Sequence, residues 1–334
     1  MATESAHPVR ATHSIPDTGD LARAVLADYP FGKVTDVLLH RRGLSDVYTA
    51  VCDDRLHVLR VYRHGWRTDS DIRWEADLLH HLASAGVPVS VTVRTRDDEP
   101  FIRLAAPEGG RQLMVLTFAE GRLLREGSSK GSAISVAEYA EAYGALAARI
   151  HTAADAFRSS HHRFELDLDH LLYRPLRAAE PLLAHRPADL DRLRAMLELI
   201  ESRLKEVVAE LDWGPCHGDL TGSNAVVDQD ALTMFDFDSG GPGWRAYDLG
   251  VFAWSTSLQR RSPDDVDRFL RGYTDVRPLP ETARAAVPLF AAAREIWFIG
   301  LQTENAPDWG YGLAGDDFLT LRLNFLQNLV EPLG

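Results

Sequence analysis

Asp219, Asn224 and Asp236 are the side chains whose types and spacing are best suited to chemistry. Two short apolar runs, at residues 225–227 and 232–235, are joined by a polar turn, a pattern typical of a β-hairpin. The hairpin would carry Asn224 at the start of one strand and Asp236 at the end of the next, with Asp219 on the loop before it. The sequence therefore predicts three oxygen-bearing side chains that converge on one point.

These side chains suit a metal ion and a hydroxyl that must lose its proton. Mg²⁺ prefers oxygen ligands and takes one or two carboxylates besides substrate phosphates, so Asn224 and Asp236 are its predicted ligands and Asp238 an auxiliary one. Asp219 is then left to orient an attacking hydroxyl and accept its proton. A His-Gly-Asp triplet alone is most often a turn, but its joint spacing with Asn224 and an Asp-Phe-Asp strand end is far more specific.

The same segment resembles the aminoglycoside phosphotransferase / choline kinase family, the small-molecule branch of the protein-kinase-like fold. Residues 216–224, 234–238 and 245–249 match the family's catalytic loop, its metal aspartate and the Arg-x-x-Asp-Leu helix start that follows. The layout is most similar to the homoserine-kinase-like and bacterial stress-response-kinase-like subgroup. The resemblance implies an enzyme that uses ATP and Mg²⁺, with His217 bracing the loop and Asp248 holding its backbone from behind.

The implied fold class is α+β, a protein-kinase-like two-lobe fold with an antiparallel-sheet N-lobe and a mainly helical C-lobe. A length of 334 residues suits two such lobes. We expect a disordered tail at 1–16, the N-lobe at 17–118 and the C-lobe with the catalytic loop and acceptor site at 119–334. A Gly/Ser-rich stretch at 122–134 predicts a mobile loop.

Four residues are candidates for the nucleotide site. Ser45 lies in a turn that would cover the ATP phosphates, although a turn with one glycine also fits an ordinary hairpin. Arg60 stands on the third strand, where kinases have a lysine; arginine keeps its charge and can still contact phosphate. Glu75, on a helix predicted over 69–85, would pair with Arg60, the alternative being a solvated helix glutamate. Glu120 lies where the family has the hinge that meets adenine.

Glu295, Trp297 and Trp309 are the candidate acceptor-site residues, because the last helices wall the acceptor site in this family. Carboxylates with aromatic rings could hold a cation; an amphipathic helix and a surface loop explain the same residues equally well. The predicted acceptor is thus the hydroxyl of a small molecule, an amino-alcohol, an aminoglycoside-like antibiotic or a sugar.

Two other functions remain open from the sequence. One is a Ser/Thr kinase that acts on a peptide or protein, for example in peptide natural-product maturation. The other is a pseudokinase that binds nucleotide without catalysis; Arg60 favours it mildly, whereas the joint presence of Asp219, Asn224 and Asp236 argues against it.

Composition argues against two classes of partner. A net charge of −13 argues against nucleic acid, and no apolar run reaches the roughly 20 residues that span a bilayer, so no membrane partner is expected. The N-terminus lacks a secretory signal pattern, and the cysteines Cys52 and Cys216 are too few for a disulfide framework. We therefore expect a cytoplasmic enzyme, with its oligomeric state left open.

Overall fold

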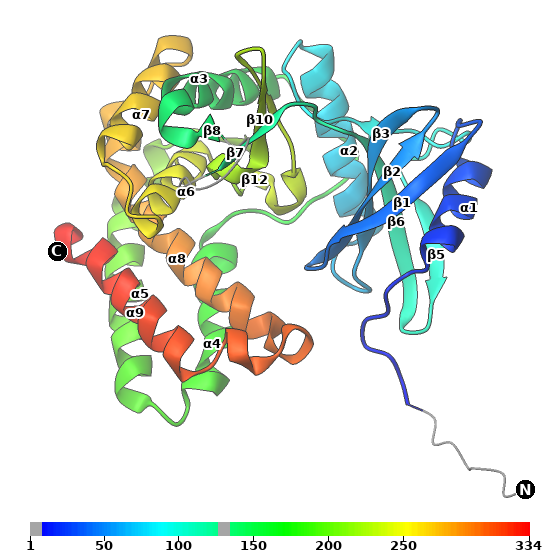
Figure 1. Cartoon of the computed structure of the whole chain (residues 1–334). Helices are drawn as coiled ribbons and strands as arrows, with labels where there is room; N and C mark the ends of the chain where they lie inside the picture. The colour runs from blue at the N-terminus through cyan, green and yellow to red at the C-terminus, as the bar shows by residue number, and fades with distance from the viewer. Residues whose placement is uncertain (1–8, 126–133) are drawn as a thin grey trace, which may run out of the picture. The chain divides into compact units, whose positions relative to one another are not determined.

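The computed structural model describes residues 9–125 and 134–334, which form two compact units (Figure 1). The described residues up to Ala76, with Val91–Phe118, make the first unit, and Asp77–Ser90 with Ala119–Gly334 make the second. The first unit thus ends where the N-lobe was expected to end. Residues 77–90, expected in the N-lobe, belong instead to the second unit, where Ser90 N donates to Met234 O at 3.0 Å.

The first unit is built on an antiparallel sheet with the order β1-β2-β3-β6-β4, and β5 pairs with β6. Asp53 and Asp54, between β2 and β3, both have positive φ, as the tightest hairpin turns require. The elements of this unit, including the helix that enters the second unit from Asp77, are α1 (Thr18–Asp28), β1 (Val34–Arg41), β2 (Ser45–Cys52), β3 (Arg55–Tyr62), α2 (Asp69–Ser84), β4 (Thr92–Val93), β5 (Ile102–Ala106) and β6 (Gly109–Thr117).

Helix α1 closes one part of this unit's core. The Asp17 side chain caps it by accepting from Gly19 N and Asp20 N, and Leu21 and Val25 on its inner face are buried. They belong to one apolar cluster with side chains of the sheet, which includes Tyr48, Leu59, Val61, Leu113 and Val115. Burial of this face fixes α1 against the strands, where Figure 1 shows it.

His13 and Ser14 lie within the predicted disordered tail but make specific contacts with the first unit. Residues 1–8 lie outside the described part, but Ser14 donates to Glu108 from Oγ at 2.8 Å, and His13 Nε2 lies 3.0 Å from Asp46 Oδ2. The Arg111 guanidinium, fully buried, donates to Ser14 O at 2.8 Å and to Asp46 at 2.7 Å. A buried guanidinium needs acceptors, and the tail supplies one of them.

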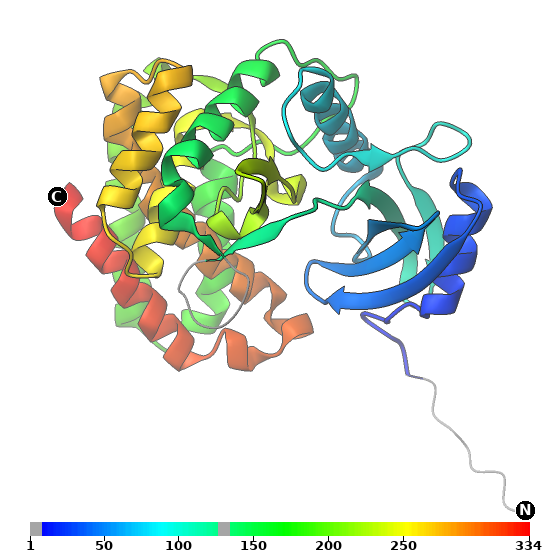
Figure 2. The same cartoon turned by 45° about the horizontal axis from the view of Figure 1, so that its top comes forward.

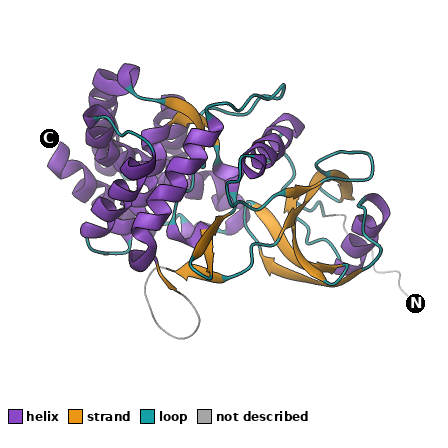
Figure 3. Ribbon diagram, turned by 90° about the horizontal axis from the view of Figure 1, so that it is seen from above, coloured by secondary structure: helices purple, strands orange, loops and turns teal. Residues whose placement is uncertain are grey.

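The second unit is mainly helical, as Figure 3 shows. Its helices are α3 (Val136–Ala154), α4 (Arg174–Leu183), α5 (Pro187–Val207), α6 (Arg245–Leu258), α7 (Asp264–Val276), α8 (Glu281–Trp309) and α9 (Asp316–Val330). Short π and 3₁₀ turns are Asp169–Tyr173, Val208–Glu210, Gly222–Asn224, Phe237–Ser239, Tyr311–Leu313 and Glu331–Leu333. No helix in 9–125 or 134–334 is both long and apolar enough to cross a membrane.

Two small sheets carry the loops of the second unit. One has the order β11-β10-β7-β8, and the other pairs β12 with β9. Their strands are β7 (Arg122–Arg125), β8 (Ile134–Ser135), β9 (Trp213–Cys216), β10 (Ala225–Asp228), β11 (Ala231–Met234) and β12 (Gly241–Trp244). Part of the predicted mobile loop is thus a strand, since β7 lies beside β10 (Figure 2), while residues 126–133 fall outside the description.

Candidate functional site

The loop after β9 carries His217, Gly218 and Asp219. Gly218 has φ +78°, and a Cβ there would collide with the carbonyl oxygen of Ser239. Only glycine fits such a backbone at such a close approach. The His-Gly-Asp triplet is therefore held in one conformation, with Asp219 leading toward the β10–β11 hairpin.

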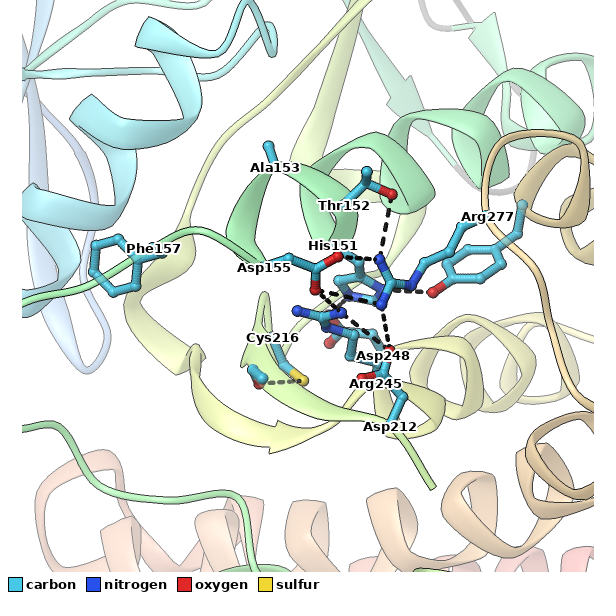
Figure 4. A network of polar contacts seen from close by, with 12 residues as sticks. His151, Thr152, Ala153, Asp155, Phe157, Asp212, Cys216, Arg245, Asp248 and Arg277 are labelled. Atoms are coloured by element: carbon cyan, nitrogen blue, oxygen red, sulfur yellow. Dashed lines mark hydrogen bonds and ion pairs between the residues drawn. The ribbon is translucent and has the colours of Figure 1, made fainter. Parts of the chain in front are cut away.

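Asp248, fully buried on α6, holds this loop from behind. Its carboxylate accepts from His217 N at 2.7 Å and from Gly218 N at 2.8 Å. It also lies 3.0 Å from Nε2 of buried His151 (Figure 4), whose Nδ1 lies 2.9 Å from the Tyr273 hydroxyl. Burial lowers the pKa of His151, so this neutral imidazole donates from Nε2. Burial alone would raise the pKa of Asp248, but the hydrogen bond from His151 and the other groups around it lower it.

Around this centre, a ring of ion pairs joins the ends of α3, α6 and α7 to the segment before β9 (Figure 4). Arg245 Nη1 lies 2.5 Å from Asp155 and 3.0 Å from Asp212, and Arg277 lies 2.7 Å from each of the same two carboxylates. Two cations share two anions, so no single bond has to hold the geometry. The ring stiffens the support under the loop that carries Asp219.

His151, Cys216 and Asp248 place donor atoms within 4.8 Å of one another. A metal would need these atoms free, yet both nitrogens of His151 and both oxygens of Asp248 already have hydrogen-bond partners. Burial raises the pKa of the Cys216 thiol well above its usual value, so it stays protonated. This cluster supports the loop and is not a metal centre.

Asp219 is the partly exposed carboxylate at the front of the loop. Its side chain is 28% exposed, Arg294 forms an ion pair with Oδ1, and Asn224 Nδ2 donates to Oδ2 at 2.7 Å and to its backbone oxygen at 2.8 Å. His217 Nδ1 accepts from Asp219 N at 3.2 Å, while its Nε2 donates to Phe235 O at 3.0 Å. Both oxygens of Asp219 are thus oriented by donors from separate elements.

Asn224 and Asp236 lie at neighbouring ends of the hairpin. Phe235 N donates to Asn224 O at 3.0 Å, which places Asp236 one residue from the Asn224 backbone. Because Asn224 Nδ2 faces Asp219, its Oδ1 is left as the acceptor. Asp236 has φ +67°, a left-handed backbone conformation that aspartate adopts more readily than most other residues with a side chain. Amide and carboxylate oxygens are among the hard oxygen ligands that suit Mg²⁺.

Asp238 occupies the turn after Asp236 and is 8% exposed. Arg163 secures this turn, because its guanidinium donates to the carbonyl oxygens of Phe237, Asp238 and Gly240. No sequence pattern indicates Arg163, which lies some 75 residues earlier in a polar stretch. The turn is therefore fixed from outside the hairpin.

Arg60 and Glu75, in the first unit, form an ion pair at 2.7 Å, as their positions predicted. Both are buried, and Tyr62 Oη lies 3.3 Å from Arg60 Nη1. Ser45 begins β2, and its buried Oγ has no hydrogen-bond partner among the described residues. Glu120, in the second unit, is exposed between β6 and β7.

The predicted acceptor residues do not come together. Glu295 is fully buried; it accepts from Arg322 Nε and from Trp254 Nε1, each at 2.7 Å, and burial raises its pKa to about 7. Trp309 ends α8 and lies about 18 Å further along the helix axis than Trp297. The carboxylate of Glu295 therefore serves the interior of the helical unit instead of a cation site.

Trp297 does lie near Asp219, through Arg294, whose guanidinium lies 4.1 Å from the indole centroid. Trp297 Nε1 lies 3.1 Å from His170 Nε2, and the His170 ring stacks on Phe164 with centroids 4.9 Å apart. All three rings are partly exposed. They form an aromatic wall that the sequence did not predict, because Phe164 and His170 stand in a polar segment.

Similar proteins carry names of the same kind of enzyme. The family model described as "Phosphotransferase enzyme family" matches residues 36–286. An "uncharacterized protein" of Deinococcus radiodurans is 39% identical over 99% of this chain and 95% of its own, and a homoserine kinase of Methylorubrum populi is 27% identical over 85% of each.

Two solved structures share the fold. A microcompartment-associated aminopropanol kinase has a TM-score of 0.75 at 19% identity, covering 93% of this chain and 95% of its own. An amicoumacin kinase, hAmiN, in complex with AMP-PNP, Ca²⁺ and Ami, has a TM-score of 0.74 at 19% identity, covering 95% and 94%. With three quarters of its length matched by the family model, the chain belongs to the phosphotransferase enzyme family and has the protein-kinase-like fold.

Proposed function

We propose that this phosphotransferase moves the γ-phosphoryl group of ATP, with Mg²⁺, to the hydroxyl of a small molecule. The observation that carries the proposal is Asp219, a partly exposed carboxylate whose two oxygens are oriented by Asn224 and Arg294. A general base must lie in the correct position before its pKa matters, and the donors around Asp219 fix the position of its carboxylate.

Asp219 orients the acceptor hydroxyl and takes its proton as the oxygen attacks the γ-phosphorus. Asn224 Oδ1 and the Asp236 carboxylate would hold Mg²⁺, with Asp238 as an auxiliary group. The ion, when bound, offsets negative charge on the phosphates. His217 and Asp248 keep the loop in place through the hydrogen bonds described above.

In the first unit, Arg60 contacts the ATP phosphates and Glu75 sets its direction. The buried ion pair with Glu75 fixes the direction of the guanidinium, whose planar fork of donors suits the oxygen atoms of a phosphate. The unpaired hydroxyl of Ser45 suits a phosphate oxygen. Glu120 would lie next to the backbone that meets adenine. An enzyme that consumes ATP would work in the cytoplasm.

The names of similar proteins support a small acceptor. Aminopropanol and homoserine each carry a hydroxyl, and the kinases named for them resemble this chain over most of its length. The acceptor is accordingly an amino-alcohol, a hydroxy amino acid, a sugar or an aminoglycoside-like antibiotic.

The test is phosphate transfer from γ-³²P-ATP and Mg²⁺ to a panel of these compounds and a Ser/Thr peptide, with Asp219→Asn as the inactive control. We expect one small-molecule class to be labelled by the wild type alone. Labelling of the peptide only would establish the protein-kinase alternative. Binding of ATP without any transfer or hydrolysis would establish the pseudokinase.

The metal ligands have a separate test. Asp236→Ala should lose the rise in melting temperature that MgATP gives the wild type, because a ligand stabilises a protein only when it binds the folded state. An unchanged rise would mean that Asp236 does not hold the metal.

A further inference from the structure

Arg294, on α8, is the cation in direct contact with Asp219. Its side chain is only 4% exposed. Nη2 pairs with Asp219 Oδ1, while Nη1 donates to Gly218 O at 2.9 Å and to Tyr247 Oη at 3.2 Å. One guanidinium therefore contacts both the carboxylate and the backbone of the catalytic loop.

The guanidinium has little freedom to move. It lies 4.1 Å from the Trp297 centroid and 5.3 Å from the Trp254 centroid, and arginine keeps its charge at every working pH. Its buried Nε has no hydrogen-bond partner within residues 9–125 and 134–334. A buried donor left unpaired costs stability, so the placement of Arg294 is better explained by a requirement at Asp219 than by folding alone.

We propose that Arg294 is a positioning residue for phosphate transfer: it fixes Asp219 in the orientation that accepts the proton, and its charge cancels the attraction that Asp219 alone would have for an ammonium group beside the reacting hydroxyl. The proposal rests on the role of Asp219 given above. In the step, the acceptor oxygen bonds to the γ-phosphorus, its proton passes to Asp219, and the bond from the γ-phosphorus to the bridging oxygen breaks to release ADP.

The geometry explains both parts. Asn224 donates to one carboxylate oxygen and Arg294 to the other, so the remaining lone pairs have fixed directions. The charges of Asp219 and Arg294 cancel, so the pair offers no net attraction to a nearby ammonium group. Glu295, the next residue on α8, does not attract the ammonium group in place of Asp219, because Arg322 already pairs with it.

The experiment compares Arg294→Met and Arg294→Lys with Arg322→Met in the full chain. Arg322 is a matched control: it is an equally buried arginine, paired with Glu295, and its guanidinium lies 6.0 Å from the Trp254 ring that Arg294 also contacts. We measure kcat and KM for ATP with acceptors paired by skeleton, such as ethanolamine with ethylene glycol and 1-amino-2-propanol with propane-1,2-diol. Thermal melting checks that each variant is folded.

We expect Arg294→Met to lose about 100-fold or more in kcat, within the range for a mispositioned base, with KM for ATP changed less than about threefold. Arg294→Lys should restore at least about a tenth of wild-type kcat, and Arg322→Met should stay within about threefold of it. The ratio of kcat with the ammonium member to kcat with the neutral member of each pair should rise about fivefold or more in Arg294→Met relative to the wild type, because Asp219 then lacks its neutralising partner. A role in folding alone would not move acceptor preference.

Wild-type kcat in Arg294→Met, or a ratio of ammonium to neutral acceptor that is unchanged by Arg294→Met, would overturn the role of Arg294 and leave the proposed function standing. If the wild type transfers phosphate to no acceptor, the rates of ATP hydrolysis to ADP are compared instead. A lower rate in both Asp219→Asn and Arg294→Met then supports the role of Arg294, although the proposed acceptor classes are wrong. Equal rates in all three proteins, or no hydrolysis by the wild type, overturn both the role of Arg294 and the proposed function. Should Arg294→Met not fold, Arg294→Gln takes its place with the same thresholds.

Discussion

Two arginine–carboxylate pairs each include one residue of α8, at the adjacent positions Arg294 and Glu295, and the pairs differ in the exposure of their carboxylates. Arg294 pairs with Asp219, whose side chain is 28% exposed, whereas Glu295 pairs with Arg322 and is 0% exposed. Trp254 contacts both pairs, since it donates to Glu295 and lies beside Arg294. The same chemical groups therefore stand a few ångströms apart in two environments.

The difference teaches that access, more than charge, separates a working carboxylate from a supporting one. Burial raises the pKa of Glu295 to about 7 even though Arg322, Trp254 and Arg294 all act to lower it. A buried pair of this kind adds little net stability compared with an apolar pair, but breaking it is costly. The Asp219 pair instead leaves a face on which a hydroxyl can lie.

The largest expected effect comes from exchanging the carboxylates one at a time. Asp219→Asn keeps the shape but not the proton acceptor, so kcat should fall about 10²–10⁴-fold with ATP binding retained. Glu295→Gln should leave kcat within about threefold of wild type. Steady-state kinetics and ATP titration on both variants check this. Equal losses of kcat in the two variants would contradict the distinction between a carboxylate that takes part in transfer and one that only supports the fold.

The pair Arg60–Glu75 sharpens the comparison, because there the arginine is the member proposed to contact the substrate. Arg60→Ala should weaken ATP binding by about 1.5–3 kcal/mol, the scale of a charge-assisted hydrogen bond, and Arg60→Lys should keep part of the activity. Calorimetric titration of ATP measures the affinity. Wild-type affinity in Arg60→Ala would show that this guanidinium does not reach the phosphates and would favour a pseudokinase.

The smallest effect concerns pH. Burial raises the pKa of Glu295 in the folded state from its ordinary value of 4.5 to about 7. Its protonated form therefore stabilises the fold fully below about pH 4.5, and that contribution is lost as the pH rises through about 7. Between pH 5 and 8 the wild type should lose about 1–3 kcal/mol of unfolding free energy relative to Glu295→Gln. Urea unfolding at several pH values tests this, and parallel curves for the two proteins would refute it.

The sequence predicted the parts of the site that depend on local order. Asn224 and Asp236 flank β10 and β11, whose apolar runs are adjacent and short, and Arg60 and Glu75 follow from a strand and the helix after it. Arg294 escaped prediction because it lies 75 residues from Asp219 and nothing in a helical pattern marks which polar residue faces a distant loop.

Two other misses have different causes. Glu295 sits among buried helix positions such as Ala292, Ile296 and Ile299, so its helical spacing points inward, whereas a carboxylate near aromatic residues predicted a cation site for the acceptor. Strands β9 and β12 consist of Trp-Gly-Pro-Cys and Gly-Pro-Gly-Trp. Glycine and proline break the alternation that identifies a strand, so only tertiary pairing reveals them.

A double-mutant cycle on kcat tests most directly whether Asp219 and Arg294 act as one unit. Asp219→Asn, Arg294→Met and the double variant are compared with the wild type under saturating MgATP and the acceptor found by transfer. If Arg294 works by positioning Asp219, the double variant should be about as slow as Asp219→Asn alone, because a base that is absent cannot be misplaced. Losses that multiply would contradict the account, since they would mean that Arg294 acts independently of the carboxylate it contacts.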